Sequence, residues 1–249
     1  MNTQHKNLVI IPTYNEIENI RNIIEAVFSL DEPFHILIIE DNSPDGTAIA
    51  VKELQQRYTD KLHMVERKGK LGLGTAYITG FKWAIANGYD FICEMDADFS
   101  HNPQDLCRLL QETRDGNNDL AIGSRYVSGV NVVNWPMGRV IMSYYASAYV
   151  RIVTGMPIRD TTAGFKCYRR IVLETINLDA IRFKGYAFQI EMKFTTWKHG
   201  FKIVEVPIIF TDRKLGSSKM SGGIFSEAFW GVINLKIKSW FKKYPKPKR

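Results

Sequence analysis

Two aspartates one residue apart, Asp96 and Asp98, stand at the end of an apolar run in the segment F-I-C-E-M-D-A-D-F-S. In a β-strand the side chains of residues i and i+2 point to the same face, so both carboxylates can reach one ion. Hard divalent cations prefer carboxylate oxygens as ligands. The pair therefore predicts a metal site for phosphate chemistry, although taken alone it also fits a polar turn that closes a strand.

Strands and helices alternate along the chain that must position this pair. Apolar runs predict strands at residues 8–11, 36–39, 62–65, 91–95, 120–122 and 203–210. Helical spacing predicts helices at residues 15–27, 72–86, 138–154 and 188–199, and one that ends at Tyr58. This order is typical of an α/β fold with a mostly parallel sheet.

In such sheets ligands bind beyond the carboxyl ends of the strands. Polar residues follow several of the predicted strands, and we expect them to share one crevice with the aspartate pair. They are Tyr14, Glu16, Asp41, Asp45 and Arg125. His63, His101 and His199 stand apart from one another, and we interpret each as a surface or structural histidine.

Composition limits the possible partners. The 249 residues carry a net charge of +7 with a pI near 9.2, which calls for an anionic partner such as nucleic acid, anionic lipid or a phosphorylated substrate. The chain has no recognisable nucleic-acid motif, so we expect no nucleic-acid partner. Three cysteines without C-x-x-C spacing fit a reducing compartment, and no uninterrupted apolar stretch approaches the roughly 20 residues that span a bilayer.

The C-terminal part differs in character. We expect a catalytic domain at residues 1–220, with a glycine-rich linker near its end, and an amphipathic helix with a basic tail at residues 221–249. On a helical wheel one arc holds the apolar residues Phe229, Trp230, Ile233, Ile237, Trp240 and Phe241, with lysines outside it. The arc fits contact with a membrane surface. Packing on the domain would bury the same arc.

Six ordered motifs carry a resemblance to a known family. They are I-I-P-T-Y-N-E (10–16), E-D-N-S-P-D-G-T (40–47), M-D-A-D-F-S-H-N-P (95–103), G-S-R-Y (123–126), D-T-T-A-G-F (160–165) and F-T-D-R-K-L-G-S-S-K (210–219). In order and spacing the chain closely resembles the polyprenyl-phosphate (dolichol-phosphate) mannosyltransferases among the inverting family 2 glycosyltransferases, in the form without transmembrane helices. The resemblance implies the glycosyltransferase-A fold, a single Rossmann-like nucleotide-binding domain, and transfer of mannose from GDP-mannose to a lipid phosphate.

The resemblance also assigns roles to matching positions. Asp96, Asp98, Arg125 and Arg213 are the expected catalytic residues. The expected donor-binding residues are these four with Pro12, Tyr14, Glu16, Ile39, Asp41, Met95, Ala97 and Lys219. Mg²⁺ or Mn²⁺ is expected on Asp96 and Asp98, with Ser100 at a third-ligand position where some relatives have an amide. Arg125, Arg139 and Ser143 match the positions that hold the acceptor phosphate.

A phosphate acceptor is already ionised at neutral pH, so we expect no strong general base and interpret Glu191 as structural or positioning. The phosphate would attack from the face opposite the diphosphate and convert an α-linked donor to a β-linked product. UDP-glucose or another nucleotide sugar remains an alternative donor. We expect the protein on the cytoplasmic face of a membrane, attached by its C-terminal helix or by a small membrane anchor protein, as in some relatives.

Overall fold

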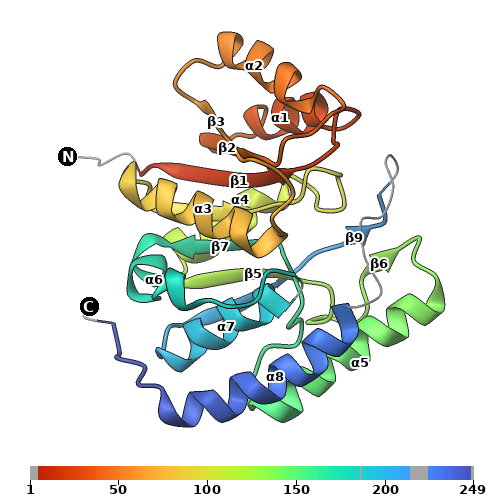
Figure 1. Ribbon diagram of the computed structural model, residues 1–249, viewed down its shortest axis with the longest axis vertical. Coiled ribbons are helices and arrows are strands. Elements are labelled where there is room, and N and C mark those ends of the chain that lie inside the picture. Colours follow the sequence, from red (N-terminus) through yellow and green to blue (C-terminus); the bar gives the residue numbers. More distant parts are fainter. Residues whose placement is uncertain (1–4, 186, 214–223, 248–249) are drawn as a thin grey trace.

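The computed structural model describes residues 5–185, 187–213 and 224–247. Its centre is a seven-stranded sheet in the order β3-β2-β1-β4-β7-β5-β8 (Figure 1). The strands are β1 (Asn7–Thr13), β2 (Phe34–Glu40), β3 (Leu62–Glu66), β4 (Phe91–Glu94), β5 (Leu120–Ser124), β7 (Lys166–Arg169) and β8 (Ile203–Pro207). Strand β7 runs antiparallel to both of its neighbours, and the other neighbouring pairs are parallel. The prediction of a mostly parallel α/β sheet is confirmed.

Helices cover both faces of this sheet. They are α1 (Ile20–Phe28), α2 (Thr47–Arg57), α3 (Leu73–Ala86), α4 (Asp105–Arg114), α5 (Met137–Thr154), α6 (Arg170–Thr175), α7 (Ala187–Lys198) and α8 (Ile224–Phe241), with a 3₁₀ turn at Leu178–Ala180. Because side chains alternate along a strand, Val9 and Ile11 pack with α1, α2 and α4 on one face. Leu8 and Ile10 pack with α3, α6 and α7 on the other.

Helix α3 lies very close to β1. A Cβ atom added at Gly80 would stand 2.7 Å from Cγ2 of Ile10 and 2.9 Å from its Cδ1. Both distances are shorter than real Cβ contacts, so the approach of helix and strand requires glycine at this position. This close packing fixes α3 against the strand that ends at the predicted donor residues.

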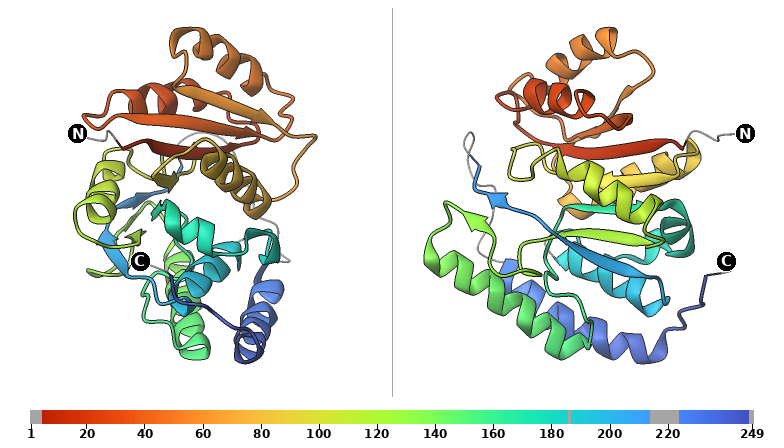
Figure 2. Two further views of the ribbon diagram at one scale, coloured as in Figure 1. Left: turned by 90° about the vertical axis from the view of Figure 1, so that its left-hand side faces the viewer. Right: turned by 180° about the vertical axis from the view of Figure 1, so that it is seen from behind.

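Helices α5 and α8 lie side by side at one end of the molecule (Figures 1 and 2). Tyr149 stacks on Phe229 with 4.8 Å between ring centroids and donates a hydrogen bond to its carbonyl. Lys236 Nζ donates to the carbonyl of Thr154 at 2.9 Å. Among the described residues, no helix is long and apolar enough to traverse a bilayer.

The structure corrects one expected strand and adds elements that the sequence did not predict. Strand β7, which no pattern predicted, contains the fully buried Lys166. Helix α4 was also not predicted. The strand expected at 203–210 is divided: β8 ends at Pro207, and β9 (Phe210–Thr211) pairs instead with β6 (Val132–Val133) in a separate small sheet.

Candidate active site

The predicted donor residues meet at one edge of the sheet, where β1, β2 and β4 end. Pro12 on β1 pairs in register with Ile39 on β2. The backbone N–H of Met95 donates to the carbonyl of Ile10 at 3.2 Å, which places the segment after β4 beside the end of β1. Strand pairing therefore brings Met95, and with it the segment that holds Ala97, beside the end of β1.

Asp98 is nearly buried and has a partner for each oxygen. Its Oδ1 accepts hydrogen bonds from the backbone N–H and the hydroxyl of Ser100, at 3.1 and 2.6 Å. Its Oδ2 lies 2.9 Å from Nη2 of Arg213. The intervening Phe99 adopts a positive φ of 58°, which turns the chain sharply between the two residues. The Ser100 hydroxyl, at the expected third-ligand position, supports Asp98.

Asp96 faces the cleft, with 40% of its side chain exposed. Desolvation of the carboxyl group by the surrounding protein and, second, the negative charge of Asp98 raise the pKa of Asp96 to about 7. Two carboxylates that repel each other in this way favour a shared cation. His101 holds the backbone at Asp96 in place, because its Nδ1 lies 3.4 Å from the Asp96 backbone nitrogen and its ring stacks on Phe165.

His101 is buried and structural, which is one of the two roles, surface or structural, expected for it from the sequence. Burial lowers its pKa to about 4. Its Nδ1 accepts from the Asp96 backbone N–H, which requires a neutral ring with the proton on Nε2. The imidazole thus stabilises the turn that carries both aspartates.

The donor set fits a divalent cation. In the described part of the chain no cluster of three or more histidine, cysteine, aspartate or glutamate side chains forms a complete metal site. Mg²⁺ is commonly bound by one or two carboxylates, with water and substrate phosphates completing its shell. Asp96 and Asp98 provide that arrangement.

Sequence reasoning missed Arg67, which pairs with Asp41. Its Nε and Nη2 donate to the two carboxylate oxygens at 2.5 and 2.6 Å, and its Nη1 donates to Thr75 at 2.8 Å. Both side chains are less than a tenth exposed. The pair fixes the Asp41 carboxylate at the end of β2, where the resemblance places contacts to base and ribose. Tyr14 lies nearby on the β1 side, with Lys70 Nζ 5.3 Å from the centre of its ring.

Turn residues keep the loops after β1 and β2 together. Asp45 accepts from the backbone N–H of Ile17 at 3.1 Å. Thr47 Oγ1 accepts from the backbone N–H of Glu16 at 3.0 Å, while the Glu16 carboxylate accepts from Asn19. Asp45 is thus a loop-positioning residue, in line with the turn chemistry of its sequence.

Arg125 forms a buried bidentate ion pair. Its Nε and Nη2 donate to the carboxylate oxygens of Asp160 at 2.7 and 2.6 Å, and Nη2 also donates to Thr162. Burial opposes ionisation, but the adjacent guanidinium lowers the pKa of Asp160 below its ordinary value. The D-T-T-A-G-F motif therefore positions Arg125 at the end of β5.

Arg139 and Ser143 lie on α5 at the wall of a cavity of about 530 Å³. The guanidinium carbon of Arg139 lies 4.0 Å from the ring centre of Trp135, and that of Arg125 lies 5.5 Å from it. Ser143 accepts a hydrogen bond from Tyr126 at 2.8 Å. The lining is mainly apolar and includes residues of α5, α7 and α8, and Asp96 and both arginines also line the cavity. The structure thus brings the predicted acceptor residues together beside the carboxylate pair.

A buried polar cluster includes Gln189, which lines the cavity. Gln189 on α7 donates to Glu94 at 2.8 Å and accepts from Lys166, which also pairs with Glu94 at 3.0 Å. Glu94 ends the strand that leads to Asp96. Glu191, two residues beyond Gln189, accepts from the backbone N–H groups of Arg182 and Phe183, at 2.9 and 3.0 Å. Lys219 lies outside the described residues.

Comparisons with known proteins show the family of this chain. The family model for glycosyl transferase family 2 matches residues 8–176. A polyprenol monophosphomannose synthase of Mycolicibacterium smegmatis is 48% identical over 232 residues, covering 91% of this chain and 87% of that protein. An undecaprenyl-phosphate mannosyltransferase of Micrococcus luteus is 46% identical over 228 residues, covering 92% of this chain and 91% of that protein.

Among solved structures, a mannosyltransferase from Pyrobaculum calidifontis in complex with GDP-Man and Mn²⁺ superposes with a TM-score of 0.61 at 16% identity. The superposition covers 98% of this chain and 67% of that one. It supports the glycosyltransferase-A fold that the sequence resemblance implied. With the matched family model and the two relatives, it leads to one conclusion: this chain belongs to glycosyl transferase family 2 and is a glycosyltransferase.

Proposed function

We propose that the protein transfers mannose from GDP-mannose to a polyprenyl phosphate with inversion at the anomeric carbon. The observation that carries the proposal is the placement of Arg125, Arg139 and Ser143 in a largely apolar cavity that also contains Asp96. A phosphate attached to an apolar chain matches both the cationic wall and the apolar lining. The two relatives, a polyprenol monophosphomannose synthase and an undecaprenyl-phosphate mannosyltransferase, support the same acceptor class.

The proposed mechanism requires positioning and charge neutralisation. A divalent cation on Asp96 and Asp98 would neutralise charge on the departing diphosphate. Arg213 adds a guanidinium beside Asp98, and Arg125 and Arg139 orient the acceptor phosphate. A phosphate oxygen forms the new bond to the anomeric carbon while the bond to the diphosphate oxygen breaks. The phosphate needs no deprotonation, and the Glu191 carboxylate already accepts two backbone N–H groups.

Transfer of radiolabelled mannose from GDP-mannose to a short-chain polyprenyl phosphate with Mg²⁺ or Mn²⁺ tests this proposal. Asp98→Ala should abolish transfer. The exposed Asp179, which pairs with Lys82 on the surface, provides the matched control, and Asp179→Ala should retain activity. UDP-glucose is tested in parallel. Product from UDP-glucose alone would change the donor assignment, and absence of product from both donors would contradict the proposal.

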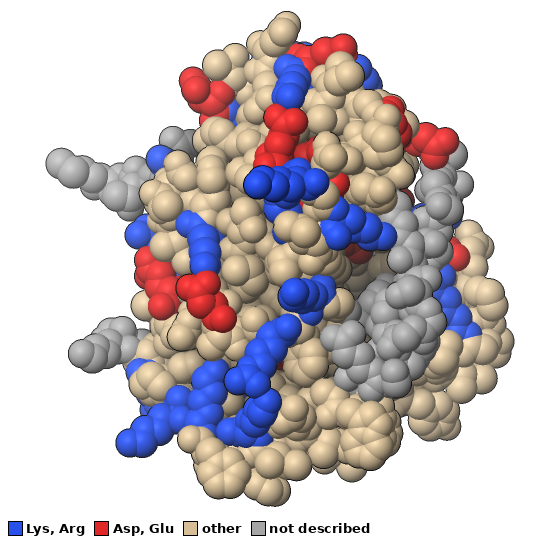
Figure 3. All heavy atoms as spheres, in the orientation of Figure 1, with Lys and Arg blue, Asp and Glu red and all other residues tan. Residues whose placement is uncertain are grey.

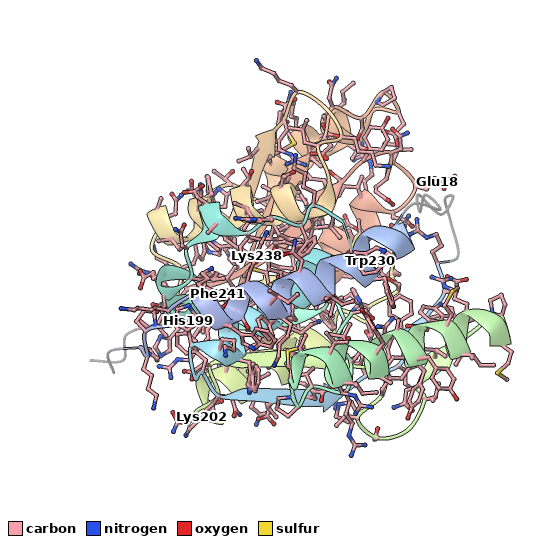
Figure 4. The ribbon with its side chains drawn as sticks, turned by 60° about the horizontal axis from the view of Figure 1, so that its bottom comes forward. Glu18, His199, Lys202, Trp230, Lys238 and Phe241 are labelled. Carbon is pink, nitrogen blue, oxygen red and sulfur yellow. The ribbon has the colours of Figure 1, made fainter. Side chains whose placement is uncertain are left out.

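We further propose that the enzyme is peripheral at the cytoplasmic face of a membrane. Most of the predicted apolar arc of α8 faces outward: Trp230 is 67%, Trp240 68% and Phe241 85% exposed. The opposite side packs Val232 into the core. Figure 4 shows Trp230 and Phe241 far apart along the same helix, and Figure 3 shows Lys and Arg side chains gathered near the C-terminal end of α8. Aromatic residues flanked by lysines suit the lipid headgroup region.

Liposome binding tests the attachment. Replacing Trp230, Ile237, Trp240 and Phe241 together by Ser should leave the protein folded, because these side chains are exposed, and should release it from anionic liposomes. Ile49→Ser on α2, an equally exposed apolar residue, is the control. Retained binding by the quadruple variant would contradict the role of α8. Binding of the wild-type protein only in the presence of a small membrane anchor protein would assign attachment to that partner.

A further inference from the structure

Residues 210–213, which we call the bridging segment, form hydrogen bonds both to the loop of the carboxylate pair and to the strand before α5. The backbone N–H of Thr211 donates to the carbonyl of Ser100 at 3.2 Å, on the side of the carboxylate pair. The backbone N–H of Asp212 donates to the carbonyl of Val133 at 3.0 Å, in the strand that precedes α5. This short segment is therefore hydrogen-bonded both to the loop that carries Asp96 and Asp98 and to the strand that precedes α5.

Two adjacent side chains of the bridging segment also form ion pairs, one with the carboxylate pair and one with α5. Arg213 pairs with Asp98, Nη2 to Oδ2, at 2.9 Å. Asp212 pairs with Arg139, Oδ1 to Nη1, also at 2.9 Å. The same Oδ1 accepts from the backbone N–H of Arg213 at 3.2 Å. A shift of the chain at Arg213 that moves its backbone N–H would therefore disturb the oxygen that binds Arg139.

We propose that Asp212 is a positioning residue that couples donor binding to acceptor binding. A diphosphate with its cation competes with Arg213 for the Asp98 carboxylate and draws the guanidinium toward its own oxygens. That movement loosens the contact between Asp212 and Arg139 and makes the Arg139 guanidinium available to the acceptor phosphate. The inference rests on the proposed function, because it takes Arg139 as an acceptor residue.

The exposure of the pair sets the size of the effect. The Arg139 and Asp212 side chains are 35% and 31% exposed, so solvent weakens their interaction. A pair of this kind changes an equilibrium by about two- to fivefold. Bound nucleotide should strengthen acceptor binding by about this factor, and acceptor should strengthen nucleotide binding equally, because coupling between two binding sites is reciprocal.

Calorimetric titration of farnesyl phosphate, with and without GDP and Mn²⁺, measures the coupling. UDP with Mn²⁺ is titrated in parallel, so that a different donor base does not hide it. The wild-type protein should show the two- to fivefold increase, and Asp212→Asn should show nearly none. Asp212→Asn should also bind farnesyl phosphate more tightly without nucleotide, since Arg139 has lost its carboxylate. Asp212→Glu should restore the coupling.

Glu32→Gln is the matched control. Glu32 pairs with Arg114 at 2.8 Å, and the two side chains are 29% and 27% exposed. The Glu32→Gln variant should show the same coupling as the wild-type protein. Coupling unchanged in Asp212→Asn, or acceptor binding weakened by that substitution, would overturn the inference while leaving the proposed function intact. Failure of the wild-type protein to bind farnesyl phosphate under all conditions would instead contradict the proposed function, and the inference with it.

Discussion

Breaking the ion pair between Arg67 and Asp41 by removing one partner should cost much stability. Both side chains are less than a tenth exposed, and three guanidinium nitrogens are used, two on Asp41 and one on Thr75. Arg67→Met removes these donors and leaves the Asp41 carboxylate buried without its counter-ion. Breaking a buried pair in this way costs about 3–5 kcal/mol. We therefore expect the free energy of unfolding to fall by that amount.

Urea unfolding with an unchanged m-value is the assay. The exposed pair of Arg57 with Glu25, with side chains 66% and 48% exposed, supplies the control, and Arg57→Met should cost less than about 1 kcal/mol. Adding Asp41→Asn to Arg67→Met should recover about 2 kcal/mol, because the uncompensated charge disappears. A loss below about 1 kcal/mol in Arg67→Met would refute the reasoning, since it would equal the value for a surface pair.

Three further outcomes are expected. Gly80→Ala should lower the free energy of unfolding by about 1–3 kcal/mol through overpacking against β1. Gly138→Ala, which has no atom within 4 Å of the added Cβ, should not lower it. Equal losses of the two variants in urea unfolding would contradict this expectation. Burial first, and for His35 also the charge of His63, lowers the pKa of both rings, so below about pH 6.5 the unfolded chain gains protons that the folded rings do not. The free energy of unfolding should therefore fall as the pH drops from about 7.5 to about 5.5, and a curve that His63→Gln leaves unchanged would exclude the His63 ring as a cause. Glu191→Gln should keep kcat within about threefold of wild type, because an amide oxygen can still accept the two backbone hydrogen bonds, while a loss of about a hundredfold, typical of a lost general base, would assign it catalysis.

The sequence predicted the elements whose pattern is local. Apolar runs such as Ile36–Ile39 reveal buried parallel strands without knowledge of their neighbours, and Asp96 and Asp98 follow one of them. Arg67 could not be assigned in this way, because its partner Asp41 is 26 residues away and the two meet only when β2 and β3 pair. Asp212 depends in the same way on β6 and β9, each two residues long.

Strand β7 was missed for a different reason. Its sequence K-C-Y-R carries charge at both ends and resembles an exposed loop. The buried Lys166 is stabilised there by Glu94, its register partner on β4, and by Gln189 on α7. Burial of a charge requires such partners, and no single segment reveals them. The same absence of local signal conceals the cavity, whose walls come from α5, α7 and α8.

The position of β7 also has a consequence for biosynthesis. Among the strands that the structure describes, β7 alone links β4, which leads to Asp96 and Asp98, with β5, which leads to Arg125. It is translated after both of them and after α5. A nascent chain whose residues 166–169 are still inside the ribosome therefore already contains Asp96, Asp98 and Arg125 but lacks the strand that joins β4 to β5. Because contacts distant in sequence form slowly, joining of the two half-sheets by β7 should be a late folding step, and catalytic competence should appear only with it.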